Sequence, residues 1–290
     1  MAPGDGAGLS RGDGGGMAVW AVSSAAVPIV AADSVDLDAL TALFNGVYSD
    51  YFVPLELDRA GLELTIDICD IDLGASRVAV EDGEPAAFAF LGLRGDEGWI
   101  GGMGTVPSHR RRGLGEAALT EVLDEARGRN AKSVRLEVIE QNEAARRLYE
   151  KVGFEHERDL GVWILDSAPP RVTKAQPAAA ADAHAWIKAN RRSPEPWQRA
   201  DETLDRMQAR GLAFEALTVD GQGAALYRGN GVLQLAARDD KAAAHLLAAV
   251  GAQGDGLRFV NVPAGDPAEA ALELLRAKMQ LRQHEMRVTL

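Results

Sequence analysis

A junction rich in arginine and glycine, residues 105–115, constrains the fold more than any other part of the chain. It reads Thr-Val-Pro-Ser-His-Arg-Arg-Arg-Gly-Leu-Gly and separates a strand-like apolar segment from one whose apolar residues recur at helical spacing. Gly113 and Gly115 allow the backbone to approach a ligand closely. The free amides at the start of the following helix, together with its dipole, form a seat for a group such as a pyrophosphate. The sequence therefore predicts an anion site at this junction.

A second motif lies downstream, over residues 142–154. It reads Asn-Glu-Ala-Ala-Arg-Arg-Leu-Tyr-Glu-Lys-Val-Gly-Phe, with Asn142 placed to cap a helix and Gly153 just past its end. The junction alone is a weak signal, since short glycine motifs arise by chance. The strand before it, the amphipathic helix after it and the second motif together make the combination more specific.

The two motifs resemble those of the GNAT superfamily of acyl-CoA N-acyltransferases. In that family R/Q-x-x-G-x-G/A grips the pyrophosphate of coenzyme A, and N-x-x-A-x-x-L-Y-x-x-x-G-F forms the neighbouring helix and strand. The resemblance covers about residues 27–165 and is specific from Met103 to Phe154. It implies an α/β protein with a mixed sheet, the GNAT fold, and acetyl-CoA as co-substrate with no metal.

The resemblance also implies roles for individual residues. Main-chain amides of residues 111–116 would hold the pyrophosphate, and the main chain of residues 103–105 would pair with the pantetheine arm like an added strand. Asn142 would contact that arm. Tyr149 would protonate the departing thiolate, because a phenol of pKa about 10 is a suitable acid for a thiol of about 8.5. The residues expected at the cofactor are Met103, Gly104, Thr105, Arg110, Arg111, Arg112, Gly113, Leu114, Gly115, Glu116 and Asn142.

The general base is less clearly indicated than the acid. Glu137 occupies the place at which some family members that acetylate peptide α-amines have their proposed proton acceptor. An attacking amine can also lose its proton through water to a more distant carboxylate, so other residues stay open. These alternatives are Glu140, Tyr48, Asp50 and Tyr51.

Plain structural roles are the alternatives for several of these residues. Tyr149 has a helical spacing from core positions, Asn142 can serve only as a helix cap, and the arginines at 110–112 can form a solvated patch. The single cysteine, Cys69, is expected in the core. The five histidines show no spacing typical of metal ligands, and we expect no metal site.

The chain of 290 residues is long enough for two domain cores, and prolines followed by an alanine run mark a linker between them. We expect a disordered leader at residues 1–24, a catalytic GNAT domain at 25–168, a linker at 169–182 and a degenerate GNAT-like domain at 183–290. The net charge of −12 argues against nucleic acid as a partner. A single cysteine, no bilayer-long apolar segment and no positive region ahead of residues 17–32 favour a cytoplasmic protein without membrane contact.

The predicted elements of the second domain repeat the order of the first, without its opening strand and last hairpin, which indicates an internal duplication. In the first domain, strands are expected at 26–31, 77–80, 85–93, 99–106, 133–139 and 154–165, and helices over 37–51, 113–128 and 142–152. In the second, helices are expected at 186–190, 194–211, 240–250 and 266–279, and strands at 212–219, 224–227, 232–236, 257–262 and up to 290.

The second domain departs from the family pattern at its own strand-to-helix junction, residues 235–242. This stretch has no glycine and places Asp239 and Asp240 at the helix start. These carboxylates would satisfy the end amides themselves and repel a phosphate. We therefore predict that the second domain binds no coenzyme A and has a structural, substrate-shaping or dimerising role.

The sequence thus predicts a tandem GNAT-like N-acetyltransferase that moves an acetyl group directly from acetyl-CoA to a primary amine of a small molecule or peptide. A coenzyme A-binding sensor without turnover and a structural protein with two inactive halves are the alternatives. Retention of Tyr149 beside the glycine junction favours turnover, since binding alone needs no acid. No motif names the acceptor amine, and a homodimer stays open.

Overall fold

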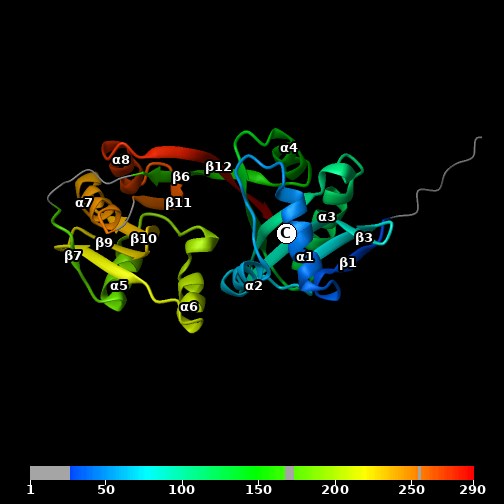
Figure 1. Ribbon diagram of the computed structural model, residues 1–290, viewed down its shortest axis with the longest axis horizontal. Coiled ribbons are helices and arrows are strands. Elements are labelled where there is room, and N and C mark those ends of the chain that lie inside the picture. Colours follow the sequence, from blue (N-terminus) through cyan, green and yellow to red (C-terminus); the bar gives the residue numbers. More distant parts are fainter. Residues whose placement is uncertain (1–26, 167–172, 254–255) are drawn as a thin grey trace, which may run out of the picture.

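The computed structural model describes residues 27–166, 173–253 and 256–290. Two halves lie side by side, each built of helices packed against strands (Figure 1). The described strands form one twelve-stranded sheet that runs through both halves. The expected leader, residues 1–24, lies outside the described residues. Among the residues that are described, none of the helices combines the length and apolar character that a membrane crossing requires.

The elements of the first half follow the expected order closely. Its strands are β1 (Ile29–Ala31), β2 (Arg77–Glu81), β3 (Glu84–Arg94), β4 (Glu97–Thr105), β5 (Ser133–Ile139) and β6 (Glu155–Leu165). Its helices are α1 (Leu37–Tyr48), α2 (Arg59–Ile68), α3 (Leu114–Gly128) and α4 (Glu143–Lys151), with 3-10 turns η1 (Ala32–Ser34) and η2 (Pro107–His109).

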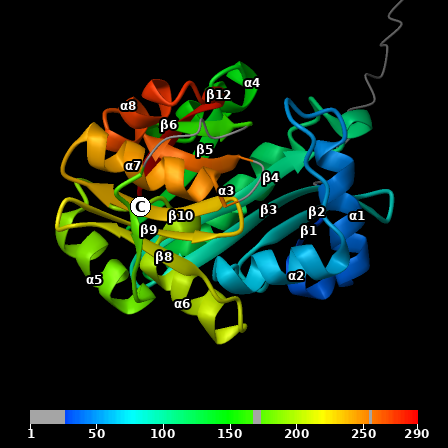
Figure 2. The same ribbon diagram turned by 60° about the vertical axis from the view of Figure 1, so that its left-hand side comes forward.

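The second half repeats this order of strands and α-helices, including a short opening strand that was not predicted from the sequence. Its strands are β7 (Gln176–Pro177), β8 (Glu215–Val219), β9 (Gly223–Arg228), β10 (Gly231–Ala237), β11 (Leu257–Pro263) and β12 (Lys278–Thr289). Its helices are α5 (Ala180–Asn190), α6 (Asp201–Ala209), α7 (Asp240–Gly251) and α8 (Pro267–Leu274), with the 3-10 turn η3 (Trp197–Arg199). Figure 2 shows α5 and α7 on opposite faces of β8, β9 and β10.

The last strand of the second half completes the sheet of the first. The strand order is β1-β2-β3-β4-β5-β12-β6-β11-β10-β9-β8-β7, so β12 lies between β5 and β6. It pairs antiparallel with β5, with Thr289 opposite Ser133 and Gln283 opposite Ile139, and its other edge pairs with β6. In turn β6 pairs with β11 of the second half. The sheet therefore does not divide at the predicted linker.

Helix α2 was not predicted from the sequence. Asp58 caps it by accepting a hydrogen bond from the Gly61 amide, as N-cap residues commonly do. Leu62 is its single fully buried residue, so its apolar stripe is too weak to identify from spacing.

Three predicted helices of the second half had wrong limits. The alanine run interpreted as part of the linker belongs to α5, which begins at Ala180, because alanine is the best helix former. The helix predicted from residue 194 begins only at Asp201, since Pro196 keeps the preceding chain extended. The helix predicted to residue 279 ends at Leu274, where the left-handed Arg276 terminates it and the Ala277 amide donates to the Leu272 carbonyl.

The two halves share a core residue next to the site. Trp197 of the second half packs in the apolar cluster formed by α1, α2 and the face of β2 and β3 that they cover. Its ring stacks on Trp99 with centroids 5.9 Å apart, and its indole N–H donates to the Cys69 carbonyl at 2.8 Å. Cys69 is buried, as predicted, and desolvation raises its thiol pKa to about 12.

Candidate functional site

The neighbouring strands β4 and β5 open a cleft in the sheet. They pair in parallel over only three residue pairs, from Glu97 opposite Ser133 to Trp99 opposite Arg135. A bulge follows at once in β4, where Gly101 has no partner on β3. Beyond it lies a cavity of about 380 Å³, here called the β4–β5 cleft. Its lining includes Gly102, Met103, Gly104, Thr105, Arg110, Gly115, Leu136, Glu137, Val138, Asn142, Leu148 and Tyr149.

The predicted anion seat lies at one end of this cleft. Arg111 and Gly113 both have a left-handed backbone, with φ of 65° and 81°, and this bend leads the chain directly into α3. No side chain among the described residues caps the first turn of α3, which leaves its amides available for a ligand. A Cβ on Gly115 would lie 3.1 Å from the Thr105 hydroxyl, so glycine keeps this approach open. The local geometry fits a pyrophosphate.

The arginines of the junction differ in their surroundings. Arg110 forms a bidentate ion pair with Asp50, at 2.6 and 2.7 Å, and Arg112 contacts Glu81 at 3.0 Å. Asp50, one of the alternative bases, is therefore held by a guanidinium, and this hydrogen bond keeps the pKa of its carboxyl below the usual range. Arg111 is exposed at the left-handed bend. The junction thus presents main-chain donors more than free cationic side chains.

The remaining predicted residues of the junction, Leu114 and Glu116, lie in the first turn of α3 and hold that helix in place. Leu114 is 2% exposed and packs with Ala86 and Ala87 below the loop. Glu116 pairs with Lys151 of α4 at 2.5 Å and so joins the two helices that flank the cleft. Their side chains do not line the cleft, so only their amides remain candidates for ligand contact.

Tyr149 is both a core residue and a lining residue of the cleft. It is 7% exposed and packs in the core with Phe154, at 5.9 Å between ring centroids, yet its side chain also lines the cleft. Burial raises the pKa of the phenol, so the group keeps its proton at neutral pH. Asn142 caps α4 by accepting from the Ala145 amide at 3.2 Å and lines the same cleft. The structure therefore brings the candidate acid and the candidate pantetheine contact together.

Glu137 is a buried carboxylate that lines the cleft. Its Oε2 accepts hydrogen bonds from the Trp99 indole at 2.9 Å and from the Gln198 amide at 3.0 Å. Its Oε1 is buried and has no partner among the described residues. Desolvation, with repulsion from Glu285 on β12, raises the carboxyl pKa to about 7. A carboxylate tuned to neutral pH suits a general base, whereas the alternative Glu140 is exposed.

The second half supplies one hydrogen bond to this carboxylate and packs against its other donor, and sequence reasoning missed both contacts. Gln198 donates to Glu137 while its own Oε1 accepts from Asn261 at 3.2 Å, and Asn261 accepts from Gln283 of β12 at 2.6 Å. Trp197 packs against Trp99, the other donor to Glu137. The local pattern around η3 carries no motif, so nothing short of the tertiary fold identifies these contacts.

Replacing Gln198 by methionine is expected to raise the pKa of Glu137. The amide stabilises the ionised carboxylate, so its loss favours the protonated form by roughly one pKa unit. In a pH profile of kcat/KM, the midpoint of the acid limb should move upward from about 7 while the high-pH plateau is kept. Gln208→Met, on the exposed surface of α6, is the matched control. An unmoved midpoint would show that Gln198 does not tune the base.

The corresponding junction of the second half is closed by its own side chains. Asp239 caps α7 and accepts from the Ala242 amide at 2.8 Å, as predicted. A carboxylate thus occupies the place where an anion would sit at this helix start. The prediction that the second half binds no coenzyme A stays a prediction, with this geometry in its favour.

A family model matches the part of the chain that lines the cleft. Residues 40–154 match the model of the Acetyltransferase (GNAT) family. The match includes the glycine junction, β4, β5 and the motif of α4. Residues 40–154 therefore match the GNAT family, and the resemblance seen in the sequence is confirmed over this segment.

Individual relatives agree with this. The chain is 38% identical over 74 residues to the ribosomal protein bS18 alanine N-acetyltransferase of Escherichia coli strain K12, a match of 26% of this chain and 50% of the relative. The chain thus spans about half the length of the curated relatives it matches.

Two solved structures share the fold over nearly the whole chain. A GCN5-related N-acetyltransferase from Sphaerobacter thermophilus has a TM-score of 0.69 at 16% identity, covering 90% of this chain and 95% of its own. A tandem GNAT protein from the clavulanic acid biosynthesis pathway has a TM-score of 0.64 at 12% identity, covering 91% and 98%. The predicted tandem GNAT fold is therefore confirmed.

Proposed function

We propose that the protein is an acetyl-CoA-dependent N-acetyltransferase that transfers acetyl directly to a primary amine of a small molecule or peptide. The observation that carries this proposal is the composition of the β4–β5 cleft. Its lining includes both the carboxyl group of Glu137, which has a pKa of about 7, and the protonated phenol of Tyr149. A base and an acid that line one cavity are what an acyl transfer between an ammonium group and a thioester requires. Binding alone requires neither.

Each residue then has a defined task. Acetyl-CoA supplies the reactive thioester when bound. Amides of residues 111–116 hold its diphosphate, and the unpaired edge of β4 beyond Gly101 aligns its arm. Glu137 accepts the proton of the acceptor ammonium. Tyr149, which burial keeps protonated at neutral pH, donates a proton to the sulfur as the thioester bond breaks.

The acceptor is expected to carry positive charge. A second cavity of about 440 Å³ lies between the halves. Its lining includes Trp99, which donates a hydrogen bond to Glu137, and Glu285, which lies opposite Glu137 in the pairing of β12 with β5. Its lining holds six carboxylates against three arginines, which favours a cationic amine over an anionic one. The net charge of the chain likewise disfavours nucleic acid as a partner.

Incubation with acetyl-CoA and a panel of amines, with release of free thiol as the readout, tests this function. We expect turnover with a subset of the amines. Calorimetry with coenzyme A should give one site per chain, because the Asp239 cap blocks the second junction. Binding without thiol release from any amine would favour the sensor function instead, and two equivalent sites would contradict the inactive second half.

A further inference from the structure

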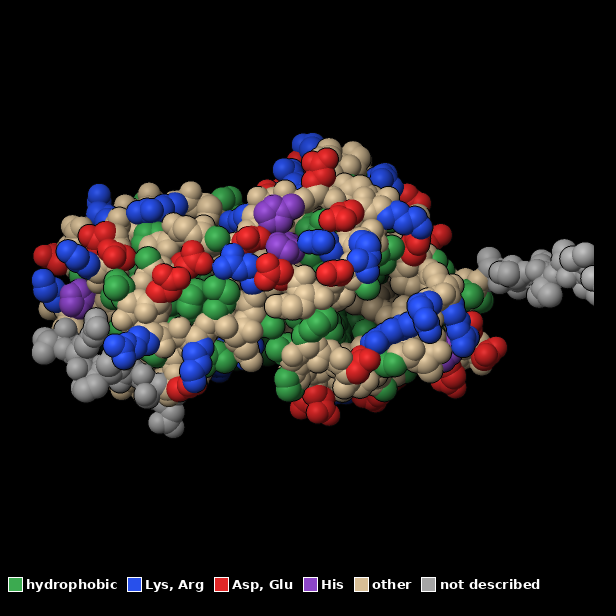
Figure 3. Space-filling model, turned by 90° about the horizontal axis from the view of Figure 1, so that it is seen from above, with side chains coloured by type: hydrophobic (Ala, Val, Ile, Leu, Met, Phe, Trp, Pro, Cys, Tyr) green, Lys and Arg blue, Asp and Glu red, His purple; other side chains and the backbone are tan. Residues whose placement is uncertain are grey.

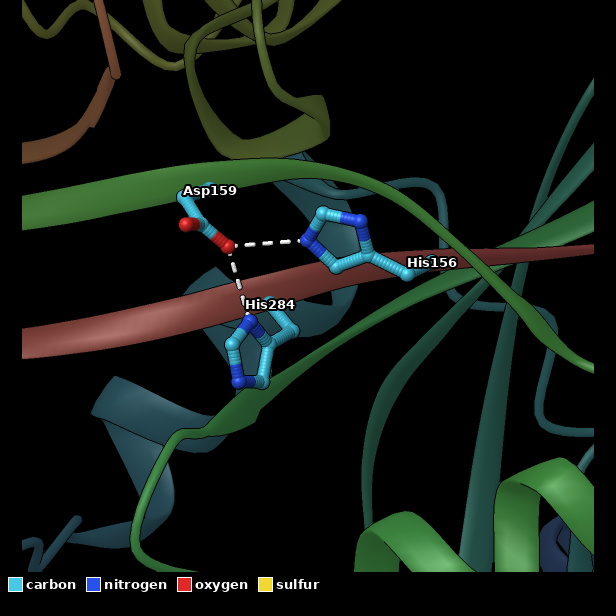
Figure 4. Close-up of side chains that lie close together, drawn as sticks. All are labelled: His156, Asp159 and His284. Carbon is cyan, nitrogen blue, oxygen red and sulfur yellow. Dashed lines mark hydrogen bonds and ion pairs between the residues drawn. The ribbon is translucent and has the colours of Figure 1, made fainter.

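Two histidines and an aspartate form a cluster outside the cleft. His156 and Asp159 lie on β6, and His284 lies on β12, directly opposite Asp159 in the antiparallel register. His156 Nε2 and His284 Nδ1 each lie 2.8 Å from the same oxygen, Oδ1 of Asp159 (Figure 4). Three potential ligand atoms therefore converge within 4.8 Å of one another. The sequence could not indicate this, because the histidines come from strands in different halves.

The arrangement of the rings matches that of two imidazoles on one ion. Their centroids are 5.2 Å apart and their planes cross at 76°. Zinc–nitrogen bonds of about 2.1 Å at a tetrahedral angle place two ring centroids roughly 5 Å apart. Ligand atoms about 2.0–2.1 Å from a tetrahedral ion lie roughly 3.3 Å apart. Each nitrogen, now 2.8 Å from Oδ1 of Asp159, would therefore have to move away from that oxygen by only about half an ångström.

The surroundings orient the carboxylate and leave the cluster accessible. Arg282 lies 3.5 Å from Oδ2 of Asp159, so Oδ1 is the oxygen turned toward the histidines. An outer contact that fixes a ligating carboxylate in this way is common around metal sites. The side chain of His156 is 53% exposed and that of His284 15%. Figure 3 shows histidine side chains gathered near the middle of one face, where an ion can enter from solvent.

We propose that His156, Asp159 and His284 bind one divalent transition-metal ion of the zinc class, with solvent completing its coordination. Two neutral imidazoles and one carboxylate suit Zn²⁺, whereas Mg²⁺ and Ca²⁺ prefer all-oxygen sites. The ion bridges β6 to β12, the strand that the second half inserts into the first. Its role is to fasten these strands beside Glu285, which is the neighbour of His284 and lies opposite Glu137.

Calorimetric titration of the chelator-treated, full-length protein with Zn²⁺ tests this site without reference to catalysis. We expect saturable binding of one equivalent and a rise in Tm of roughly 5 °C when the ion is about a hundredfold above Kd. Mg²⁺ should produce neither effect. Titration of the chelator-treated protein with Co²⁺ in place of Zn²⁺ should give the intense visible absorption of a tetrahedral site, not the weak absorption of an octahedral one.

Three variants decide which residues are responsible. His156→Ala, at a largely exposed position, and Asp159→Asn should each lower the Zn²⁺ affinity at least tenfold. His245→Ala, at a histidine outside the cluster, should bind as the unmodified protein does. Absence of saturable Zn²⁺ binding, equal binding of Mg²⁺, or binding unchanged in both cluster variants would overturn the proposal.

Discussion

Replacing Glu137 by glutamine is expected to lower kcat/KM for acetyl transfer by about 10² to 10³ at pH 7.5, the usual contribution of a positioned general base. Glutamine has nearly the same shape and can still accept the hydrogen bonds from Trp99 and Gln198, so the cleft should keep its form. The acid limb of the pH profile, which we expect at the Glu137 pKa of about 7 in the unmodified protein, should disappear. The lower kcat/KM and the loss of the acid limb can both be measured from initial rates of thiol release between about pH 5.5 and 9. This range spans the Glu137 pKa of about 7.

The same substitution should stabilise the protein above pH 7. The folded carboxyl has a pKa of about 7 and an unfolded one of about 4.3, so between these values the folded state binds more protons. Stability therefore falls as pH rises through this window, and the ionised Glu137 costs on the order of 3 kcal/mol at pH 8. Removing that charge should raise Tm at pH 8 by at least about 3 °C.

Glu140→Gln is the matched control, since Glu140 is exposed three residues further along the chain. It should leave both kcat/KM and Tm within error of the unmodified protein. Full activity in the Glu137 variant, or equal losses in the two variants, would remove Glu137 from the mechanism. A large fall in Tm for Glu137→Gln would instead indicate a structural role for the carboxylate.

Replacing Gly113 by aspartate should abolish measurable binding of coenzyme A, with a loss in affinity of more than about 100-fold. A carboxylate about 5 Å from the diphosphate costs roughly 3 kcal/mol per charge pair at an effective dielectric constant near 20. The backbone of the new aspartate would also have to adopt a φ of 81°, which costs about 1 kcal/mol or more for a residue with a Cβ. Calorimetry with coenzyme A measures the affinity directly.

Gly221→Asp separates the loss of binding from backbone strain. Gly221 also has a left-handed backbone, with φ of 65°, and a Cβ there would meet nothing within 4 Å, as at Gly113. This variant should show a similar small fall in Tm and an unchanged affinity for coenzyme A. If Gly113→Asp bound the cofactor normally, the diphosphate could not lie at the start of α3, and the proposed function would lose its basis.

The sequence was most informative where the signal is local. The junction at Gly113, the stripe of α3 and the cap at Asn142 each lie within one short segment, and the structure shows each element as expected. Glu137 and Tyr149 were assigned from a motif, and the fold places both on one cleft.

What the sequence could not predict depends on pairing between distant segments. Gln198 reaches Glu137 only because η3 packs under Trp99, and no periodicity encodes that contact. The position of β12 was likewise hidden, since a strand pattern does not specify its neighbour. For the same reason, the spacing of the five histidines did not indicate that His156 and His284 lie together.

The position of β12 affects how the chain acquires its fold during synthesis. A ribosome releases β5 and β6 long before residues 278–289 exist. One edge of β5 and both edges of β6 therefore stay unpaired until the strands of the second half are made. Such edges are prone to pair with other chains. Unlike ordinary tandem proteins, in which the N-terminal domain folds first as a unit, this molecule completes its N-terminal half last.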